Sequence, residues 1–98
     1  MIRHVVLLTF VDSATAAQIQ AVENALSALP ARLPQLQAYD IGRDLRLNDA
    51  NATFAVVADF ASVDDYVVYR DDAEHRRIIA ELISPILAGR TAAQYEIA

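Results

Sequence analysis

The segment IRHVVLLTFV, residues 2–11, decides the fold of this chain. It is rich in Val, Leu and Phe and contains no Gly or Pro, so an extended backbone is favoured. Apolar side chains occupy both alternating sets of positions, which is the pattern of a strand covered on both faces. Residues 2–11 are therefore predicted to form a central strand of a sheet.

The segment TFAVVADF at residues 53–60 has the same character and predicts the other central strand. Between the two, Thr15 and Gln18 form a capping-box pattern ahead of a predicted helix at about 15–29. The apolar residues of that helix recur three or four positions apart. A shorter strand is predicted at residues 36–43, where apolar and aromatic side chains alternate.

The last third of the chain is predicted to contain two helical segments and a strand. Ser62 begins a helix that extends to about residue 69, where a polar Arg-Asp-Asp sequence interrupts its apolar stripe. A further helical segment is predicted from 73 to 84, because Pro85 would end it. Gly89 then precedes a last strand, predicted at residues 90–97.

The order of the elements predicts one α+β domain over residues 1–98. A strand, a helix, two strands, a helix pair and a strand form the βαββαβ unit of ferredoxin-like folds. The first and third strands lie in the middle of a four-stranded antiparallel sheet, and the helices cover one face. The other face would remain bare, and a large exposed apolar surface is typical of an interface. A homodimer formed through this sheet face is therefore expected, although the sequence does not fix which alternating set of side chains meets the partner.

Composition and charge exclude several classes of function. The net charge is −5, and no basic run interleaves with aromatics, so nucleic acid is not an expected partner. Two histidines without metal-ligand spacing, no cysteine and only two glycines predict no metal site, no phosphate-binding loop and no cofactor. The apolar N-terminal segment is too short to cross a membrane. A cytoplasmic location, away from membranes, is expected.

The chain resembles the stress-responsive dimeric α/β-barrel (Dabb) domain family over nearly its whole length. The resemblance rests on residues 2–10, 42–44 (Gly-Arg-Asp), 57–60 (Val-Ala-Asp-Phe), 66–75 and 85–95. The family's usual His-Pro-x-His segment is Asp72-Ala73-Glu74-His75 here, so only the second His is kept.

This resemblance implies a homodimer with a barrel-like interface and a pocket between each sheet and its helices. Many relatives have no assigned reaction, whereas a plant polyketide cyclase of the family performs aldol chemistry without a cofactor. The pocket residues of that cyclase match His4, Tyr69 and His75 of this chain, and a further pocket His matches Phe54. His4 and Phe54 are thus expected to contact substrate, and Tyr69 and His75 to be catalytic.

His75 suits the role of general base, because imidazole titrates near neutral pH and could remove a proton beside a carbonyl. Tyr69 could donate a hydrogen bond to the resulting enolate oxygen. The substrate would then be a small, largely apolar carbonyl compound. Two alternatives remain open: a non-catalytic stress or ligand-binding protein in which these side chains are packing residues, and a cofactor-free monooxygenase of the same dimeric architecture.

Overall fold

The sheet has the predicted topology. The computed structural model describes residues 1–98, and its four antiparallel strands lie in the order β2-β3-β1-β4. The central strands are β1 (Ile2–Phe10) and β3 (Phe54–Phe60), and the edges are β2 (Ala38–Arg43) and β4 (Leu87–Glu96). The ferredoxin-like arrangement expected from the order of the elements is confirmed.

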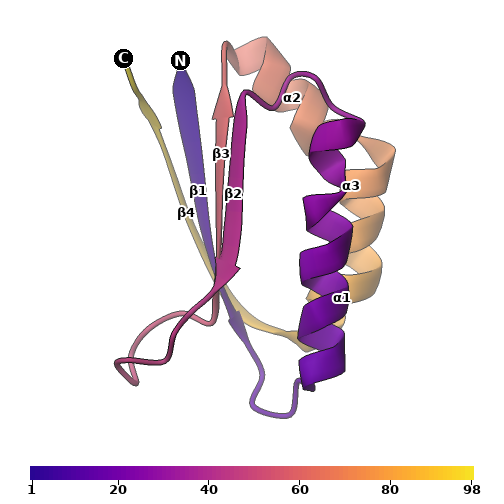
Figure 1. Ribbon diagram of the computed structural model, residues 1–98, viewed down its shortest axis with the longest axis vertical. Helices are drawn as coiled ribbons and strands as arrows, with labels where there is room; N and C mark the ends of the chain where they lie inside the picture. Colours follow the sequence, from indigo (N-terminus) through magenta and orange to yellow (C-terminus); the bar gives the residue numbers. More distant parts are fainter.

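Three helices cover one face of the sheet (Figure 1). They are α1 (Ala16–Ser27), α2 (Val63–Asp71) and α3 (Ala73–Ile78), and a short 3-10 turn, η1 (Leu29–Ala31), follows α1. The predicted caps are present: Thr15 and Gln18 form a capping box at α1, and the Ser62 hydroxyl accepts a hydrogen bond from the Asp65 N–H at α2. No helix reaches the length and apolarity that a membrane crossing requires.

The segment after α3 departs from the sequence prediction. It continues as a π-helical turn, η2 (Ile79–Ile83), and a 3-10 turn, η3 (Ser84–Ile86), and β4 follows directly at Leu87. Pro85 lies within η3, near the start of a turn where a missing N–H has little cost, and so does not end a helix at residue 84. Leu87 already pairs with Phe10, beside a bulge in β4 between Leu87 and Gly89, which places Gly89 inside the strand. The predicted strand start at residue 90 was three residues late.

Alternate positions of the central strands face opposite environments. His4, Val6, Leu8 and Phe10 of β1 are buried toward the helices, together with the even-numbered residues of β3. Leu7, on the other face of β1, is 40% exposed. The odd-numbered positions of β1 therefore form the bare face, and His4 lies on the helix side. We call this bare surface the open face of the sheet.

The β2–β3 loop (residues 44–53) projects from one end of the open face, on the side away from the helices (Figure 1). Arg46 has a left-handed backbone, with φ of 58°. Its N–H donates to the Asp44 carboxylate at 2.8 Å, and its guanidinium donates to that carboxylate and to the carbonyls of Asn51 and Ala52. These bonds offset the strain of a non-glycine residue in this conformation.

Candidate functional site

Three of the four predicted site residues line one cavity between the sheet and the helices. The cavity has a volume of about 310 Å³, and His4 reaches it from β1, Tyr69 from α2 and His75 from α3. Most of the remaining wall is apolar and includes Ile79 and Ile83 from the π-helical turn. A largely apolar cavity with a few convergent polar groups is the usual form of a small-molecule site.

His75 is held in one tautomer by the backbone. Its Nδ1 lies 3.3 Å from the Arg70 carbonyl oxygen, which can only accept a hydrogen bond, so Nδ1 carries the proton. Nε2 makes no hydrogen bond within the protein and is not fully buried. A molecule in the cavity can therefore reach it. Burial lowers the pKa of His75, against the opposing effects of the backbone carbonyls and the Asp72 charge. The neutral ring can accept a proton at Nε2.

The departure from the family's His-Pro-x-His segment has a direct structural consequence. Asp72 follows α2 and is the N-cap of α3, where its carboxylate accepts a hydrogen bond from the His75 N–H at 2.9 Å. Asp is a favoured N-cap residue. The position of His75 in the first turn of α3 is thereby fixed without the missing His and Pro.

Tyr69 lies between His75 and a second tyrosine that the sequence did not single out. The rings of Tyr69 and His75 are 4.1 Å apart between centroids, and the Tyr69 hydroxyl lies 3.3 Å from the hydroxyl of Tyr39 on β2. Burial raises the pKa of both phenols, so each remains a hydrogen-bond donor at neutral pH. If Tyr39 donates to Tyr69, the Tyr69 proton is free to point elsewhere.

His4 has the opposite tautomer from His75. The Gln94 side-chain amide donates to His4 Nδ1 at 2.9 Å, so a neutral His4 carries its proton on Nε2. Burial lowers the pKa of His4, and the positive charge of Arg90 lowers it further. One histidine thus offers the cavity a donor and the other an acceptor.

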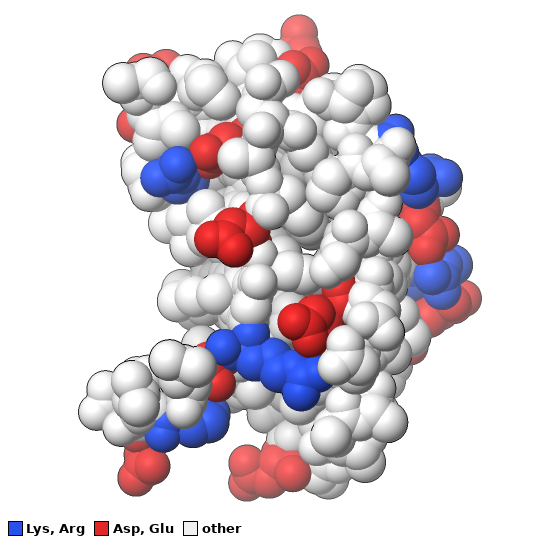
Figure 2. Space-filling view, viewed as in Figure 1, with Lys and Arg blue, Asp and Glu red and all other residues white.

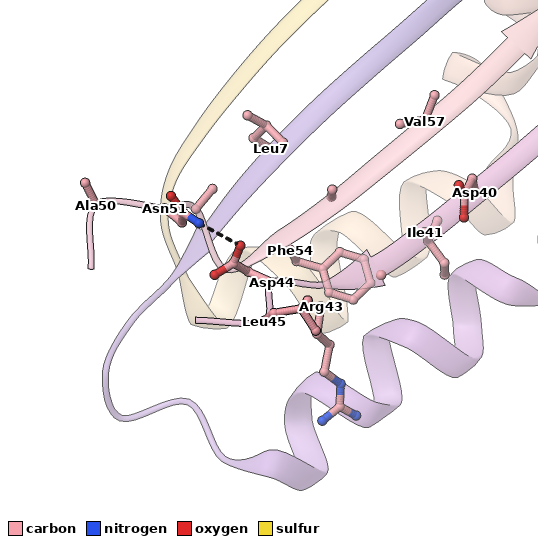
Figure 3. Close-up of a pocket in the computed structure, with 13 residues that line it drawn as sticks. Leu7, Asp40, Ile41, Arg43, Asp44, Leu45, Ala50, Asn51, Phe54 and Val57 are labelled. Carbon is pink, nitrogen blue, oxygen red and sulfur yellow. Dashed lines mark hydrogen bonds between the residues drawn. The ribbon is translucent and has the colours of Figure 1, made fainter. Parts of the chain in front are cut away.

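Phe54 does not line this cavity. It is 1% exposed at the start of β3, its ring lies 6.0 Å from that of Phe10 in the core, and it borders a different hollow. That hollow, of about 650 Å³, lies between the open face and the β2–β3 loop. Figure 3 shows Leu7 and Val57 on its floor and the hydrogen bond between Asn51 and Asp44 in its wall. No group of three or more His, Asp or Glu side chains lies close enough to hold a metal ion.

Sequence reasoning missed several polar residues around the cavity, among them Tyr39, Gln94, Arg76 and Arg90. Tyr39 and Gln94 hold Tyr69 and His4 respectively, and Arg76 and Arg90 lie in the wall. Arg90 and Gln94 reach the helix side because β4 pairs with β1 in a register that sets them opposite Leu8 and His4. Only strand pairing reveals this register. For Tyr39 the sequence offered one signal, its alternation with Ile41, and that pattern indicated only a strand.

We expect the free energy of unfolding to fall as the pH is lowered from 7 to 5. The pKa values of His4 and His75 are depressed in the folded chain, so below about 6.5 the unfolded chain binds more protons and stability is lost. Each histidine contributes a slope of at most about 1.4 kcal/mol per pH unit. Urea unfolding at stepped pH measures this, and His75→Asn should give a shallower slope. A flat profile between pH 7 and 5 would contradict it.

Comparisons with solved structures agree on the fold. A dimeric ferredoxin-like protein of unknown function from Thermobifida fusca YX is 43% identical, with a TM-score of 0.90 over 98% of this chain and 90% of that one. A hydroxynitrile lyase from Passiflora edulis is 21% identical, with a TM-score of 0.84 over 99% of this chain and 93% of that one. An antibiotic biosynthesis monooxygenase is 12% identical, with a TM-score of 0.81 over 100% and 99%.

The last two similarities show a shared fold alone, because one fold supports many chemistries. No curated protein matches the chain. The family model of the stress responsive A/B barrel domain matches residues 2–97, nearly the whole sequence. Together with the topology of the sheet and helices, this match shows that the chain belongs to the stress responsive A/B barrel domain family.

Proposed function

We propose that the cavity is the active site of a cofactor-independent enzyme that transfers a proton next to a carbonyl group, as in aldol cyclisation. The observation that carries the proposal is the arrangement of His75 and Tyr69. Their rings are 4.1 Å apart on the wall of one open cavity, and the His75 proton is held on Nδ1 by the Arg70 carbonyl. A base and a hydrogen-bond donor can then reach the same small molecule.

In the proposed step, His75 Nε2 removes a proton from the carbon beside the carbonyl. The electrons of the broken C–H bond form the enolate, and its charge develops on the carbonyl oxygen. The Tyr69 hydroxyl donates to that oxygen, and in this step it accepts from the Tyr39 hydroxyl, which lies 3.3 Å away. The enolate carbon can then attack a second carbonyl, and the proton returns from His75 to the new alkoxide. All protons and electron pairs of this step are accounted for, so it needs no oxidant, reductant or metal.

Packing alone would be supported by a filled site in which both ring nitrogens of His75 bonded to the backbone. The cavity beside His75 and the absence of a hydrogen bond at its Nε2 support binding and catalysis instead. A non-catalytic binding protein remains the second candidate, because the same cavity could hold a small apolar compound without converting it. The monooxygenase alternative has no support beyond the shared fold.

We also propose that two copies associate through the open face. Leu7 is 40% exposed in the middle of a central strand, where an apolar side chain ordinarily has a covering layer. At one end of this face Arg3 and Asp59 form a bidentate ion pair, so the charges of these two side chains balance. The similar Thermobifida fusca structure is described as dimeric, which supports the same assembly here. The cavity, on the helix side, stays accessible in such a dimer.

Proton exchange tests the enzyme proposal without knowledge of the natural substrate. The protein is incubated in deuterium oxide with methyl ketones of rising chain length, and loss of the carbon-bound proton beside the carbonyl is followed by NMR. We expect exchange about 10²-fold faster than with the same concentration of free imidazole, because the base and the donor are positioned together. Exchange no faster than with imidazole for every ketone would contradict the proposal.

A further inference from the structure

The arginines divide into two groups by their partners. Six of the eight form ion pairs with carboxylates: Arg3, Arg32, Arg43, Arg46, Arg70 and Arg77. The remaining two, Arg76 and Arg90, make no side-chain hydrogen bond or ion pair, and both line the cavity that holds His75. A guanidinium that has no partner inside the protein is available to an anion from outside.

No carboxylate stands in the cavity wall beside these two arginines, although Asp71 lies close enough to Arg76 for the Arg76 charge to lower the pKa of Asp71. None of the thirteen carboxylates lines the cavity, although the chain as a whole has a net charge of −5. Figure 2 shows acidic and basic side chains interspersed over the face in view, without a broad positive area. The two arginines without a carboxylate partner therefore both lie at one largely apolar cavity.

The two arginines approach the cavity from opposite sides. Arg90 lies opposite Leu8 in the strand register, which directs it toward the helices and away from the open face. Arg76 follows His75 directly on α3. Their charges also act on the histidines, since Arg90 lowers the pKa of His4 and Arg76 that of His75, in each case after the larger effect of burial.

We propose that this cavity selects small organic carboxylates, with the carboxylate bound by Arg76 and Arg90 and the apolar body against Leu8, Leu26 and Val56. The proposal rests on the proposed function, because it names the substrate class of the same site: a carboxylate that also carries a carbonyl within reach of His75 and Tyr69. The volume of about 310 Å³ suits a short-chain compound.

The cavity favours a carboxylate over a phosphate, because its wall lacks the backbone N–H groups that commonly bind phosphate. No glycine lines the cavity, so no backbone nest is available for a phosphate. The N-terminus of α3 is already capped by the carboxylate of Asp72. A planar guanidinium binds a planar carboxylate through two parallel hydrogen bonds.

Binding of three matched compounds tests this specificity. Octanoate, 2-nonanone and heptyl phosphate share one alkyl chain and differ in the group at its end, and calorimetry at low salt gives each dissociation constant. We expect octanoate to bind at least about tenfold more tightly than 2-nonanone, with the preference shrinking as salt is added. Equal affinities, absence of octanoate binding, or tighter binding of heptyl phosphate would overturn the proposal.

Replacing single arginines with the neutral Gln shows which side chains cause the preference for octanoate over 2-nonanone. Arg76→Gln and Arg90→Gln should each abolish most of it and leave the affinity for 2-nonanone unchanged. Arg77→Gln is the matched control, because Arg77 is adjacent in sequence but pairs with Glu74 and Glu81 outside the cavity. An equal loss in Arg77→Gln would attribute the preference to overall charge and overturn the assignment.

The outcome separates this inference from the proposed function. If octanoate binds with the expected preference and no ketone exchanges a proton, the carboxylate site stands and the catalytic proposal fails. If ketones exchange rapidly and octanoate has no advantage, the catalytic proposal stands and the carboxylate site fails.

Discussion

Replacing His75 with Asn is expected to lower kcat/KM for proton exchange by at least about 10²-fold while the chain stays folded. The Asn side-chain amide nitrogen can occupy nearly the place of His Nδ1, so the hydrogen bond to the Arg70 carbonyl can persist. The nitrogen accessible from the cavity is lost. Exchange rates by NMR and the midpoint of thermal unfolding measure the two effects separately.

The structural alternative predicts the reverse pattern for the same variant. If His75 only packs against Tyr69, His75→Asn should cost about 1 to 3 kcal/mol of stability, and neither wild type nor variant should exchange protons above the imidazole rate. The wild-type pH profile adds a second readout. Because the pKa of His75 is depressed, kcat/KM should be level near pH 7 and fall only on the acid side, below the usual histidine range. Loss of activity on going from pH 7 to 8 would contradict a neutral His75 base.

The hydroxyl of Tyr69 gives a milder variant of the same test. Tyr69→Phe keeps the ring stacked on His75 and removes the donor to the enolate oxygen, so a loss of roughly tenfold is expected. Tyr95→Phe makes the same chemical change on the exposed part of β4, and its rate should match wild type.

Replacing Leu7 with Glu is expected to convert a dimer into monomers. Light scattering of the wild type should give twice the mass of one chain at micromolar concentration. Each dimer of the variant would bury two unpaired carboxylates, at several kcal/mol each, so the dissociation constant should rise at least about 10³-fold. Partial unfolding should follow, because the open face would lose its cover.

The matched control is Val68→Glu, which introduces the same charge at a side chain of similar exposure on α2. Val68 is 44% exposed and Leu7 40%, but Val68 lies in the helical layer and Leu7 on the open face. The mass of Val68→Glu should remain that of the wild type. A monomeric wild type, or a Leu7→Glu variant that keeps the dimer mass, would contradict association through the sheet.

The fold was predictable because its main signals are local. Apolar residues on both alternating sets of residues 2–11 indicated a central strand, and the caps at Thr15 and Ser62 gave the helix starts. The boundary near Pro85 was not predictable in this way. A proline that would end a helix is tolerated in a 3-10 turn, and the start of β4 depends on pairing with Phe10 across the sheet.

The site was predictable only in part. The resemblance to the family indicated His4, Tyr69 and His75, which do meet at one cavity. It also indicated Phe54, which is a core residue because its position on β3 packs against Phe10. Arg90 could not be found from sequence, because its importance arises from what the other arginines contact and from the register of β4. Such properties depend on the whole folded chain.

The hydrogen bonds of Arg46 have a consequence for the rate at which two copies would meet. They hold the β2–β3 loop in shape within a single chain, independently of any partner, while Leu45 and Leu47 remain exposed on it. The proposed association would then join surfaces that are already formed, at the roughly 10⁵–10⁷ M⁻¹s⁻¹ typical of rigid docking. In Arg46→Ala the loop would have to become ordered during each encounter. The association rate constant would therefore fall by more than the dissociation rate constant would rise.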